Sequence, residues 1–408
     1  MNRLLYVSFD GVLQPLAFSQ VVRPVAALAQ RGFGYHLLSL ERTRDLADPA
    51  RVRRVREALG GVPWTPIGVD LGSARRSGEA FSRMIAAGLA IARREGTTLV
   101  HARGHQGAVV AVAAAKALGT RYLFDVRGCW IEERPDWFSR PSAFALGKLA
   151  ERQFYEGAAG YSTLTELLAN DIAAGAYRTP GRPLRVITTC ADFDEFCLAP
   201  RSVEAGAAGP PEELRRALAG RTVVGIVGSL NRSYAVEATM ELARRILAAS
   251  PTTHLLVLSH QTAEYRERLA REGIAESRST VHAVAHDEMR HWLPWIDWGM
   301  LLLHEVAAKR GSMPTKLAEF FATGVRPLAF GCNSEMMSWV RRTGSGLALD
   351  SLEPEALDAA AARVAHATPD HDAVARAREI ARPHFSLEAG VQRYAELLGE
   401  VARAGPHA

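Results

Sequence analysis

The stretch KRGSMPTKLAEFFATG, residues 309–324, gathers residue types that suit the binding of an anion. Pro314 fits the first turn of a helix, where its missing N–H costs nothing, and Ser312 is a candidate cap. A lysine at position 316 is unfavourable beside the positive end of a helix dipole unless it neutralises something. Lys316 and Glu319 are three residues apart and therefore share a helical face.

Two interpretations of this pair remain open from the residues alone. Lys316 and Glu319 can form a surface ion pair, which contributes little to stability. Alternatively, Lys316 neutralises a bound phosphate and Glu319 accepts hydrogen bonds from the vicinal hydroxyls of a ribose. A Walker P-loop is excluded, because Thr315 stands where the Gly-Lys-Ser/Thr motif requires a glycine.

A second candidate phosphate site is VVGIVGSLNRSY, residues 223–234, where a β-like run enters a polar loop before a helix. Gly228 lets backbone N–H groups approach a phosphate, a helix N-terminus favours an anion, and Arg232 suits phosphate oxygens. One glycine and one arginine also suit an ordinary strand-to-helix turn, and this motif by itself favours that plainer interpretation.

Further polar residues follow β-like runs in the first half of the chain. They are Asp10, Gly11, His101, Arg103, His105 and Arg127. Because the carboxyl ends of parallel strands meet at one edge of a sheet, we expect these residues to lie there together. Histidines can ligate metals, but no cysteine or carboxylate completes a metal site at a suitable spacing, so no metal site is predicted.

The elements that position these residues alternate between short β-like runs and longer helical patterns. The expected strands are 4–9, 35–40, 98–102, 121–126, 160–165, 184–189, 222–229, 253–259, 279–284, 298–303 and 325–330. The expected helices include 19–31, 77–95, 104–118, 142–157, 234–249, 313–323 and an amphipathic tail. This alternation predicts an α/β protein with mostly parallel sheets covered on both faces.

A segment rich in proline, glycine and alanine, residues 198–214, interrupts the alternation and is interpreted as a linker. We therefore expect two doubly wound, Rossmann-like domains at 1–200 and 201–382, followed by a helix within 383–408. If the two domains face each other, a ligand site is expected in the cleft between them.

Five motifs occur in the order and at the spacing of one enzyme family. They are DGVLQPLAFSQV (10–21), HARGHQGAVVAVAAAKALGTRYLFDVRGCWIEER (101–134), VITTCADFDEF (186–196), VGSLNRSY (227–234) and SMPTKLAEFFATGVRPLAF (312–330). Over nearly the whole chain they resemble a subset of family 4 glycosyltransferases, which are retaining enzymes of the GT-B fold with a Ser-Pro-Thr-Lys-x-x-Glu element.

The resemblance implies that the second domain binds a nucleoside-diphosphate sugar, that the first binds the acceptor, and that the tail helix packs back on the first. It implies donor contacts from Gly228, Ser229, Arg232, His260, Lys309, Ser312, Thr315, Lys316 and Glu319. It implies acceptor contacts from Asp10, Gly11, Gln20 and His105, and it assigns His101, Arg103 and Arg127 to the reacting centre. His105 also suits a capping role at the start of its helix.

The implied reaction is transfer of the sugar with retention, through a front-face displacement in which the leaving phosphate takes the acceptor proton. It needs no metal, no permanently bound cofactor and no dedicated general base. The chain departs from the family at Gly311, where many members have a carboxylate, so the sugar contacts are undetermined. It also has Ser229 where many members have a basic residue, so Arg232, Lys309 or Lys316 would neutralise the phosphate.

Composition narrows the function classes only modestly. The chain has 408 residues, a net charge of +5 and four cysteines without CxxC spacing, which favours a reduced, cytoplasmic compartment. No run is long enough for a signal peptide or a membrane span, and no nucleic-acid motif occurs. The basic run RVRRVRE, 51–57, is interpreted as a solvated helix, so membrane contact is at most peripheral.

Two alternatives to a transferase remain: a GT-B sugar-nucleotide epimerase, and a non-catalytic protein that binds a nucleotide sugar. The acceptor is either a small metabolite or a lipid-linked or polysaccharide sugar. The sequence makes no prediction of the oligomeric state.

Overall fold

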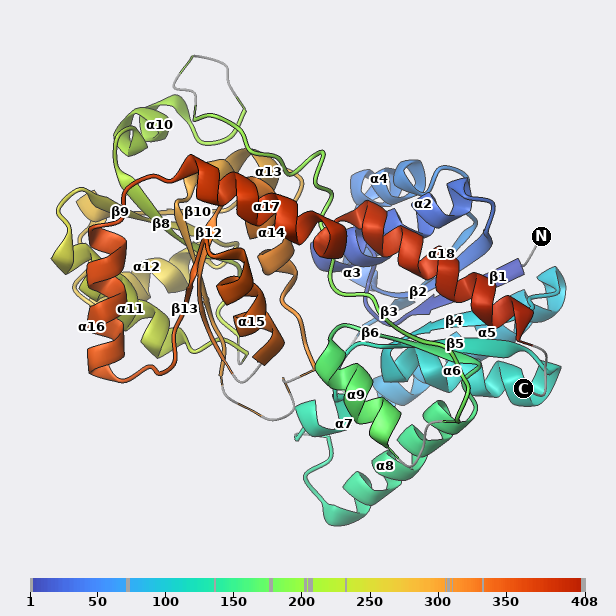
Figure 1. Cartoon of the computed structure of the whole chain (residues 1–408). Helices are drawn as coiled ribbons and strands as arrows, with labels where there is room; N and C mark the ends of the chain where they lie inside the picture. Colours follow the sequence, from blue (N-terminus) through green and yellow to red (C-terminus); the bar gives the residue numbers. More distant parts are fainter. Residues whose placement is uncertain are drawn as a thin grey trace. The chain divides into compact units, whose positions relative to one another are not determined.

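A computed structural model describes residues 3–70, 74–135, 137–175, 179–201, 204, 208–231, 233–304, 306, 309, 311–331 and 334–404. The chain divides into two compact units, coloured along the sequence in Figure 1. Unit 1 comprises Met1–Cys190, Ala308–Met313 and Leu387–Ala408, and unit 2 comprises Ala191–Ala307 and Pro314–Ser386. The chain thus passes between the units at 190/191, 307/308, 313/314 and 386/387, whereas the sequence suggested 200/201 and 382/383.

Unit 1 is built on a parallel sheet of seven strands in the order β3-β2-β1-β4-β5-β6-β7. The strands are β1 Arg3–Ser8, β2 Gly34–Arg42, β3 Trp64–Val69, β4 Leu99–Arg103, β5 Arg121–Val126, β6 Gly160–Thr163 and β7 Leu184–Val186. The helices are α1 Pro15–Ala17, the π-helix η1 Phe18–Val22, α2 Arg23–Gln30, α3 Thr43–Leu46, α4 Pro49–Leu59, α5 Ala74–Glu95, α6 Gly104–Leu118, α7 Trp130–Glu133, α8 Pro141–Glu156, α9 Glu166–Ala174 and α18 Leu387–Arg403.

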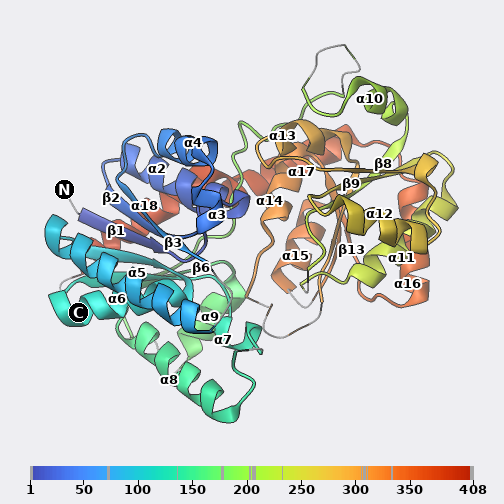
Figure 2. The ribbon, with the colours of Figure 1, turned by 180° about the vertical axis from the view of Figure 1, so that it is seen from behind.

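Helices cover both faces of the unit 1 sheet. Along β1, Leu4 and Tyr6 join the core beneath α2, α4 and α18, whereas Leu5 and Val7 join the core beneath α5 and α6. This alternation follows from the period of two in a strand. Figure 2 shows α5 and α6 on the face opposite α18. The tail helix α18 packs beside α2 and buries Tyr394.

Unit 2 has a parallel sheet of six strands in the order β10-β9-β8-β11-β12-β13. The strands are β8 Thr222–Val227, β9 Thr253–Leu258, β10 Ser279–His282, β11 Trp298–Leu302, β12 Arg326–Phe330 and β13 Leu347–Ala348. The helices are α10 Glu212–Leu218, α11 Val236–Ala249, α12 Thr262–Arg271, η2 Glu276–Arg278, α13 Met289–Trp292, η3 Leu293–Trp295, α14 Thr315–Thr323, α15 Ser334–Thr343, α16 Pro354–Ala365 and α17 His371–Phe385.

Both units are therefore doubly wound parallel α/β structures, and the predicted α/β class is confirmed. The sequence analysis missed two strands, β3 and β13, which lie at sheet edges. Pro66 and Gly68 interrupt the β-like pattern of β3, and an edge strand tolerates both residues because one of its sides is unpaired. None of the described helices is both long enough and apolar enough to cross a bilayer.

Candidate active site

In unit 1, Asp10, Gly11, Arg103 and Arg127 lie at or just beyond the carboxyl ends of strands, and in unit 2 the same holds for Gly228, Ser229 and His260. In unit 1 the strand order reverses between β1 and β4, and in unit 2 it reverses between β8 and β11. Ligands of open parallel sheets bind outside the carboxyl ends of the strands at such a reversal. Each unit therefore has one edge at which a ligand is expected.

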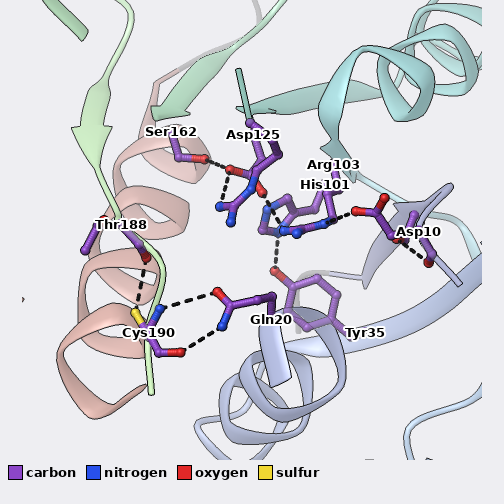
Figure 3. A network of polar contacts seen from close by, with 11 residues as sticks. Asp10, Gln20, Tyr35, His101, Arg103, Asp125, Ser162, Thr188 and Cys190 are labelled. Atoms are coloured by element: carbon purple, nitrogen blue, oxygen red, sulfur yellow. Dashed lines mark hydrogen bonds and ion pairs between the residues drawn. The ribbon is translucent and has the colours of Figure 1, made fainter. Parts of the chain in front are cut away.

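Five polar side chains form a connected network at this edge of unit 1 (Figure 3). Arg103, the last residue of β4, donates from Nε to Asp10 Oδ2 at 2.9 Å. Its Nη1 lies 3.7 Å from Asp125 Oδ2 on β5. Arg127 Nη1 lies 3.5 Å from Asp125 Oδ1, which also accepts a 2.9 Å hydrogen bond from Ser162. The structure thus brings Asp10, Arg103 and Arg127 together.

Asp125 lies at the centre of the network and was not among the expected site residues. Its side chain is fully buried, and burial raises the pKa of a carboxyl group. The guanidinium groups of Arg127 and Arg103 outweigh that effect and hold the pKa of Asp125 below its ordinary value. A buried carboxylate between two cations fixes their positions, because its removal would leave Arg127 without a carboxylate partner among the described residues and Arg103 with Asp10 alone. The available signal was a single charge near the end of the apolar strand RYLFDV.

His101 lies beneath the network, in the core of unit 1. The residue is 1% exposed, and its ring lies 4.4 Å from that of Tyr6 and 5.2 Å from that of Tyr394. Its Nδ1 shares a 3.0 Å hydrogen bond with the hydroxyl of Tyr35. Burial lowers the pKa of His101 to about 4, so the imidazole is neutral at neutral pH. These are the contacts of a core residue, and direct contact with a substrate stays a prediction.

A cavity of about 130 Å³ lies beside the network. Its lining includes Asp10, Arg103, His105, Arg127, Trp130 and Glu133. His105 is buried, with its Nε2 2.8 Å from Glu151 Oε1 and its ring stacked on Trp130 at 6.0 Å. Burial raises the pKa of Glu151, but His105 and Lys148 together hold it below its ordinary value. The side chain of His105 is thus engaged by a carboxylate and does not cap α6.

Gly11 follows Asp10 and begins a turn that Gln14 N closes by donating to Gly11 O at 2.9 Å. The backbone N–H groups of Val12 and Leu13 donate to the Glu41 carboxylate at 2.8 and 3.2 Å. A Cβ at Gly11 would lie 3.0 Å from Glu41 Oε2, so the glycine leaves room for this contact. Glu41 is buried, which raises its pKa, and the sequence analysis did not single it out.

Three further expected residues hold segments of unit 1 together. Gln20 on η1 donates to Cys190 O at 2.7 Å and accepts from Cys190 N at 3.3 Å. Lys309 Nζ donates to Glu133 Oε2 at 3.0 Å, and Ser312 Oγ donates to Glu133 Oε1 at 3.3 Å. Glu133 therefore joins α7 to the segment at 309–313, and it is a cavity-lining carboxylate that the sequence analysis missed.

The prediction that Ser312 caps the following helix was wrong. Helix α14 begins at Thr315, its N-cap is Pro314, and no side chain caps it. Gly311 packs against Leu168 of α9, because a Cβ at that position would lie 3.0 Å from Leu168 Cδ2. Leucine thus occupies the space that a larger side chain at residue 311 would need.

At the carboxyl edge of unit 2, a cation lies beside a glycine turn. Gly228 follows β8 with a φ of +106°, a conformation that favours glycine. A Cβ on Gly228 would lie 2.6 Å from Lys316 Nζ, which marks how closely the ammonium approaches this turn. Lys316 donates to the Tyr234 hydroxyl at 2.9 Å and lies 4.1 Å from the centre of that ring. Within the described part of the chain, Lys316 forms no ion pair.

Glu319 follows one helical turn later and is 6% exposed. Its Oε1 lies 3.0 Å from His286 Nε2, in the loop before α13. Lys316 and Glu319 do not pair with each other, so the interpretation of a mutual surface ion pair is wrong. Instead, each has its own aromatic or imidazole partner at the edge of unit 2.

The other described residues that were expected to contact the donor are more exposed or make fewer side-chain contacts. Ser229 is exposed, and its Oγ accepts from Asn231 Nδ2 at 3.2 Å. His260 is exposed just beyond the end of β9, and Thr315 is the first residue of α14. Arg232 lies outside the described residues.

Tyr234 and His286 were missed at this edge. No sequence spacing relates Tyr234 to Lys316 or His286 to Glu319, because each pair joins segments that are distant in the chain. Only the polar composition of SLNRSY hinted that its loop approaches a site.

A larger cavity, of about 690 Å³, lies at the opposite edge of the unit 2 sheet. It is lined at the amino ends of β8, β11 and β12 by residues that include Thr222, Asp297 and Arg326. Arg201 also lines this cavity, and its Nη2 lies 2.7 Å from Asp297 Oδ1. Size alone would favour this cavity, but parallel sheets place their ligands at the other edge.

Comparison with known proteins agrees with the geometry. Residues 19–190 match the model of a glycosyl transferase 4-like domain. This domain indicates a glycosyltransferase enzyme. The matched region contains the whole network around Asp125 except Asp10. No curated protein matches the chain in sequence.

Solved structures resemble the chain over nearly its full length. Sucrose-phosphate synthase from Thermosynechococcus elongatus has a TM-score of 0.72 at 15% identity, covering 99% of this chain and 100% of that chain. The Anabaena protein Alr3699/HepE in complex with UDP-glucose has a TM-score of 0.69 at 14% identity, covering 98% and 100%. A Listeria monocytogenes protein assigned as a UDP-N-acetylglucosamine 2-epimerase has a TM-score of 0.65 at 12% identity, covering 100% and 98%. These similarities establish the GT-B fold.

Proposed function

We propose that the protein is a retaining glycosyltransferase that moves a sugar from a nucleoside-diphosphate sugar to a hydroxyl of an acceptor. One observation carries the proposal. The half-buried ammonium of Lys316 lies beside the Gly228 turn at the carboxyl edge of unit 2, without a carboxylate partner among the described residues. A cation beside a glycine turn, with no carboxylate to compensate its charge, suits a diphosphate.

Glu319 suits the ribose of the same donor. Its Oε1 is engaged with His286, while Oε2 has no hydrogen bond within the described part of the chain. Because α14 carries Lys316 and Glu319 three residues apart, one helix start would hold both the diphosphate and the ribose. Anabaena HepE, which shares the fold, was solved with UDP-glucose.

We place the acceptor at the carboxyl edge of unit 1. Asp10 and Arg127 line the cavity there, and the buried Asp125 fixes Arg103 and Arg127. In the proposed reaction the bond between the sugar C1 and the diphosphate oxygen breaks, and C1 bonds to the acceptor oxygen on the same face. The departing diphosphate oxygen takes the acceptor proton. The proposed reaction therefore does not require His101 as a general base. Product stereochemistry tests this step, because inversion at C1 would exclude it.

Titration calorimetry with UDP, GDP and ADP tests the donor site. We expect one nucleotide to bind wild type, and we expect Lys316→Ala to weaken its binding by tenfold or more, about 1.4 kcal/mol or above. Lys116→Ala is the matched control, since Lys116 is an exposed lysine on α6. Unchanged affinity in Lys316→Ala would remove the observation on which the proposal rests.

The whole-chain likeness to the Listeria protein keeps an epimerase as a second candidate. Incubation with the bound nucleotide sugar alone separates the two functions. An epimerase converts the donor to its epimer without any acceptor, whereas a transferase hydrolyses it slowly and a non-catalytic protein leaves it intact. We propose a cytoplasmic site of action, supported by the free thiols of Cys190 and Cys197.

A further inference from the structure

Unit 1 exposes an unusual group of large apolar side chains on α8 and the loop before it. Eight large hydrophobic residues are exposed within the described part of the chain, and four of them fall between residues 137 and 149. They are Trp137 at 41%, Phe144 at 39%, Leu146 at 67% and Leu149 at 58% exposure. We call this group the α8 face.

The α8 face results from a helix whose outward side is apolar. Residues 141–150, PSAFALGKLA, contain a single charge, Lys148. That charge is used within the unit, because Lys148 Nζ donates to Glu132 at 2.9 Å and also to Glu151. The inward side is formed by Gly147, Glu151 and Phe154. In this stretch the usual arrangement of a surface helix, polar outside and apolar inside, is therefore lost.

The charges around the α8 face are arranged for an anionic surface. The acidic groups are neutralised within the unit, since Glu132 and Glu151 bind Lys148 and Glu133 binds Lys309. At the rim, Arg140 is exposed beside the first turn of α8, and the Arg134 guanidinium lies 4.4 Å from the centre of the Trp137 ring. Asp136 lies outside the described residues. Tryptophan and arginine at the border of an apolar helix are typical of the interfacial region of a membrane.

The α8 face also continues into the acceptor cavity. Trp130 lines that cavity, and its ring contacts those of Trp137 and Phe138 with centroid distances of 5.4 Å each. Phe138 in turn packs closely over Gly147 of α8. A row of aromatic side chains therefore connects the exposed surface to the cavity.

From these contacts we infer that the α8 face docks on a lipid bilayer containing anionic headgroups, and that the acceptor is a lipid-linked hydroxyl presented from that bilayer. The second part rests on the proposed transferase function. A protein partner would require hydrogen-bonding groups across the interface, roughly one for each 100–200 Å². On the outward side of 141–150 only Ser142 offers a polar side chain, and lipid chains require none.

Helix α4 contains the basic run 51–57, which the sequence analysis interpreted as a solvated helix. In α4, Arg51 pairs with Asp45 and Asp48 at 3.2 Å each. Arg54 stacks over Phe18 at 4.5 Å and Arg56 over Trp64 at 5.7 Å. These arginines pack onto unit 1, which confirms the interpretation of 51–57 as an ordinary surface helix.

Flotation of the full chain with vesicles of phosphatidylcholine and phosphatidylglycerol tests the docking. We expect wild type to float with the vesicles and Leu146→Glu/Leu149→Glu to lose at least about tenfold in partitioning. Arg140→Glu should weaken partitioning only when phosphatidylglycerol is present. Leu16→Glu, which alters an exposed leucine of the same unit, is the matched control and should float as wild type does.

Calorimetry with the nucleotide separates the outcomes, because the α8 face belongs to unit 1 whereas Lys316 and Glu319 belong to unit 2. The double variant should keep the melting temperature and nucleotide affinity of wild type and lose transfer to a vesicle-borne acceptor. Failure of wild type to float, with nucleotide binding intact, would overturn this inference and leave the proposed function standing. A double variant that dissociates a wild-type dimer in light scattering, without vesicle binding by wild type, would assign the face to a second copy instead.

Discussion

The carboxyl edges of the two sheets have the same topology, but their cations differ in whether carboxylates compensate them. In unit 1, Arg103 and Arg127 are both held by carboxylates, and the central one, Asp125, is fully buried. In unit 2, Lys316 has only a hydroxyl and an aromatic ring as partners within the described residues. One edge has internally compensated charges, and the other has a cation available to an external anion.

This difference indicates two kinds of site. A network of compensated charges fixes the direction of its hydrogen-bonding groups, which suits recognition of a neutral hydroxyl compound. An uncompensated ammonium beside a glycine turn provides net attraction, which suits a diphosphate. Under the proposed function, the chain separates orientation of the acceptor from charge neutralisation of the donor, and four predictions test that separation.

The largest effect is expected from Asp125→Asn. The variant leaves two buried or half-buried guanidinium groups without their shared carboxylate, so we expect the free energy of unfolding to fall by about 3–5 kcal/mol. Urea denaturation measures it. Asp10→Asn is the control, because the Asp10 side chain is 57% exposed and its ion pair should contribute about 1 kcal/mol or less. Similar losses in the two variants would show that burial of Asp125 is unimportant.

A pH dependence is expected next, from a buried histidine. The folded pKa of His101 is about 4, below its ordinary 6.5, so the unfolded chain binds a proton that the native state does not. Its contribution to stability is therefore complete above pH 6.5 and declines as the pH falls towards 4, by up to about 3 kcal/mol. In unit 2, burial lowers the pKa of His254 to about 4 as well, so both units should weaken in acid.

Replacing His101 by Phe should flatten this dependence. We expect the urea midpoint of His101→Phe to fall less between pH 7 and pH 4.5 than that of wild type, whatever its value at pH 7. His254→Phe should flatten the dependence through unit 2 and serves as the comparison. Equal slopes in wild type and His101→Phe would contradict a neutral buried imidazole at this position.

A smaller effect is expected from Glu319→Gln, which tests the ribose contact. The amide keeps the shape but is a weaker acceptor than the carboxylate, so we expect about a tenfold loss of affinity for the preferred ribonucleotide. The variant should also discriminate less between that nucleotide and its 2′-deoxy analogue. Glu267→Gln, an exposed carboxylate on α12, is the control in the same unit. If Glu319→Gln discriminated between the nucleotide and its 2′-deoxy analogue as well as wild type does, Glu319 would not contact the ribose.

The smallest effect is expected from Lys309→Ala. Because the Lys309 ammonium is already paired with Glu133 at 3.0 Å, we expect nucleotide affinity to change by less than about threefold. Lys316→Ala, measured beside it by calorimetry, should show a much larger loss. If Lys309→Ala lost as much nucleotide affinity as Lys316→Ala, both lysines would act as phosphate ligands. The proposed difference between the two edges would then be wrong.

Sequence reasoning reached the fold because its signals are local. Apolar runs such as 222–229 and amphipathic stretches such as 234–249 encode their own secondary structure, and their alternation specifies a parallel sheet. The edge strand β3 was not predicted, because Pro66 and Gly68 weaken its local β-strand pattern. Its parallel pairing with β2 stabilises the strand instead. The Ser312 cap failed because α14 begins at Thr315 with Pro314 as its N-cap, so Ser312 lies two residues before the capping position.

The sequence by itself determined the residue types at each carboxyl edge, because a residue that directly follows a parallel strand lies at that edge of the sheet. Only the tertiary structure decided which of these charged residues form ion pairs with one another. It buried His101 between two tyrosines, joined Arg103 and Arg127 through Asp125, and gave Lys309 a carboxylate that Lys316 lacks. The physical reason is that burial and ion pairing depend on side chains brought together from distant segments, and no spacing along the chain records those encounters.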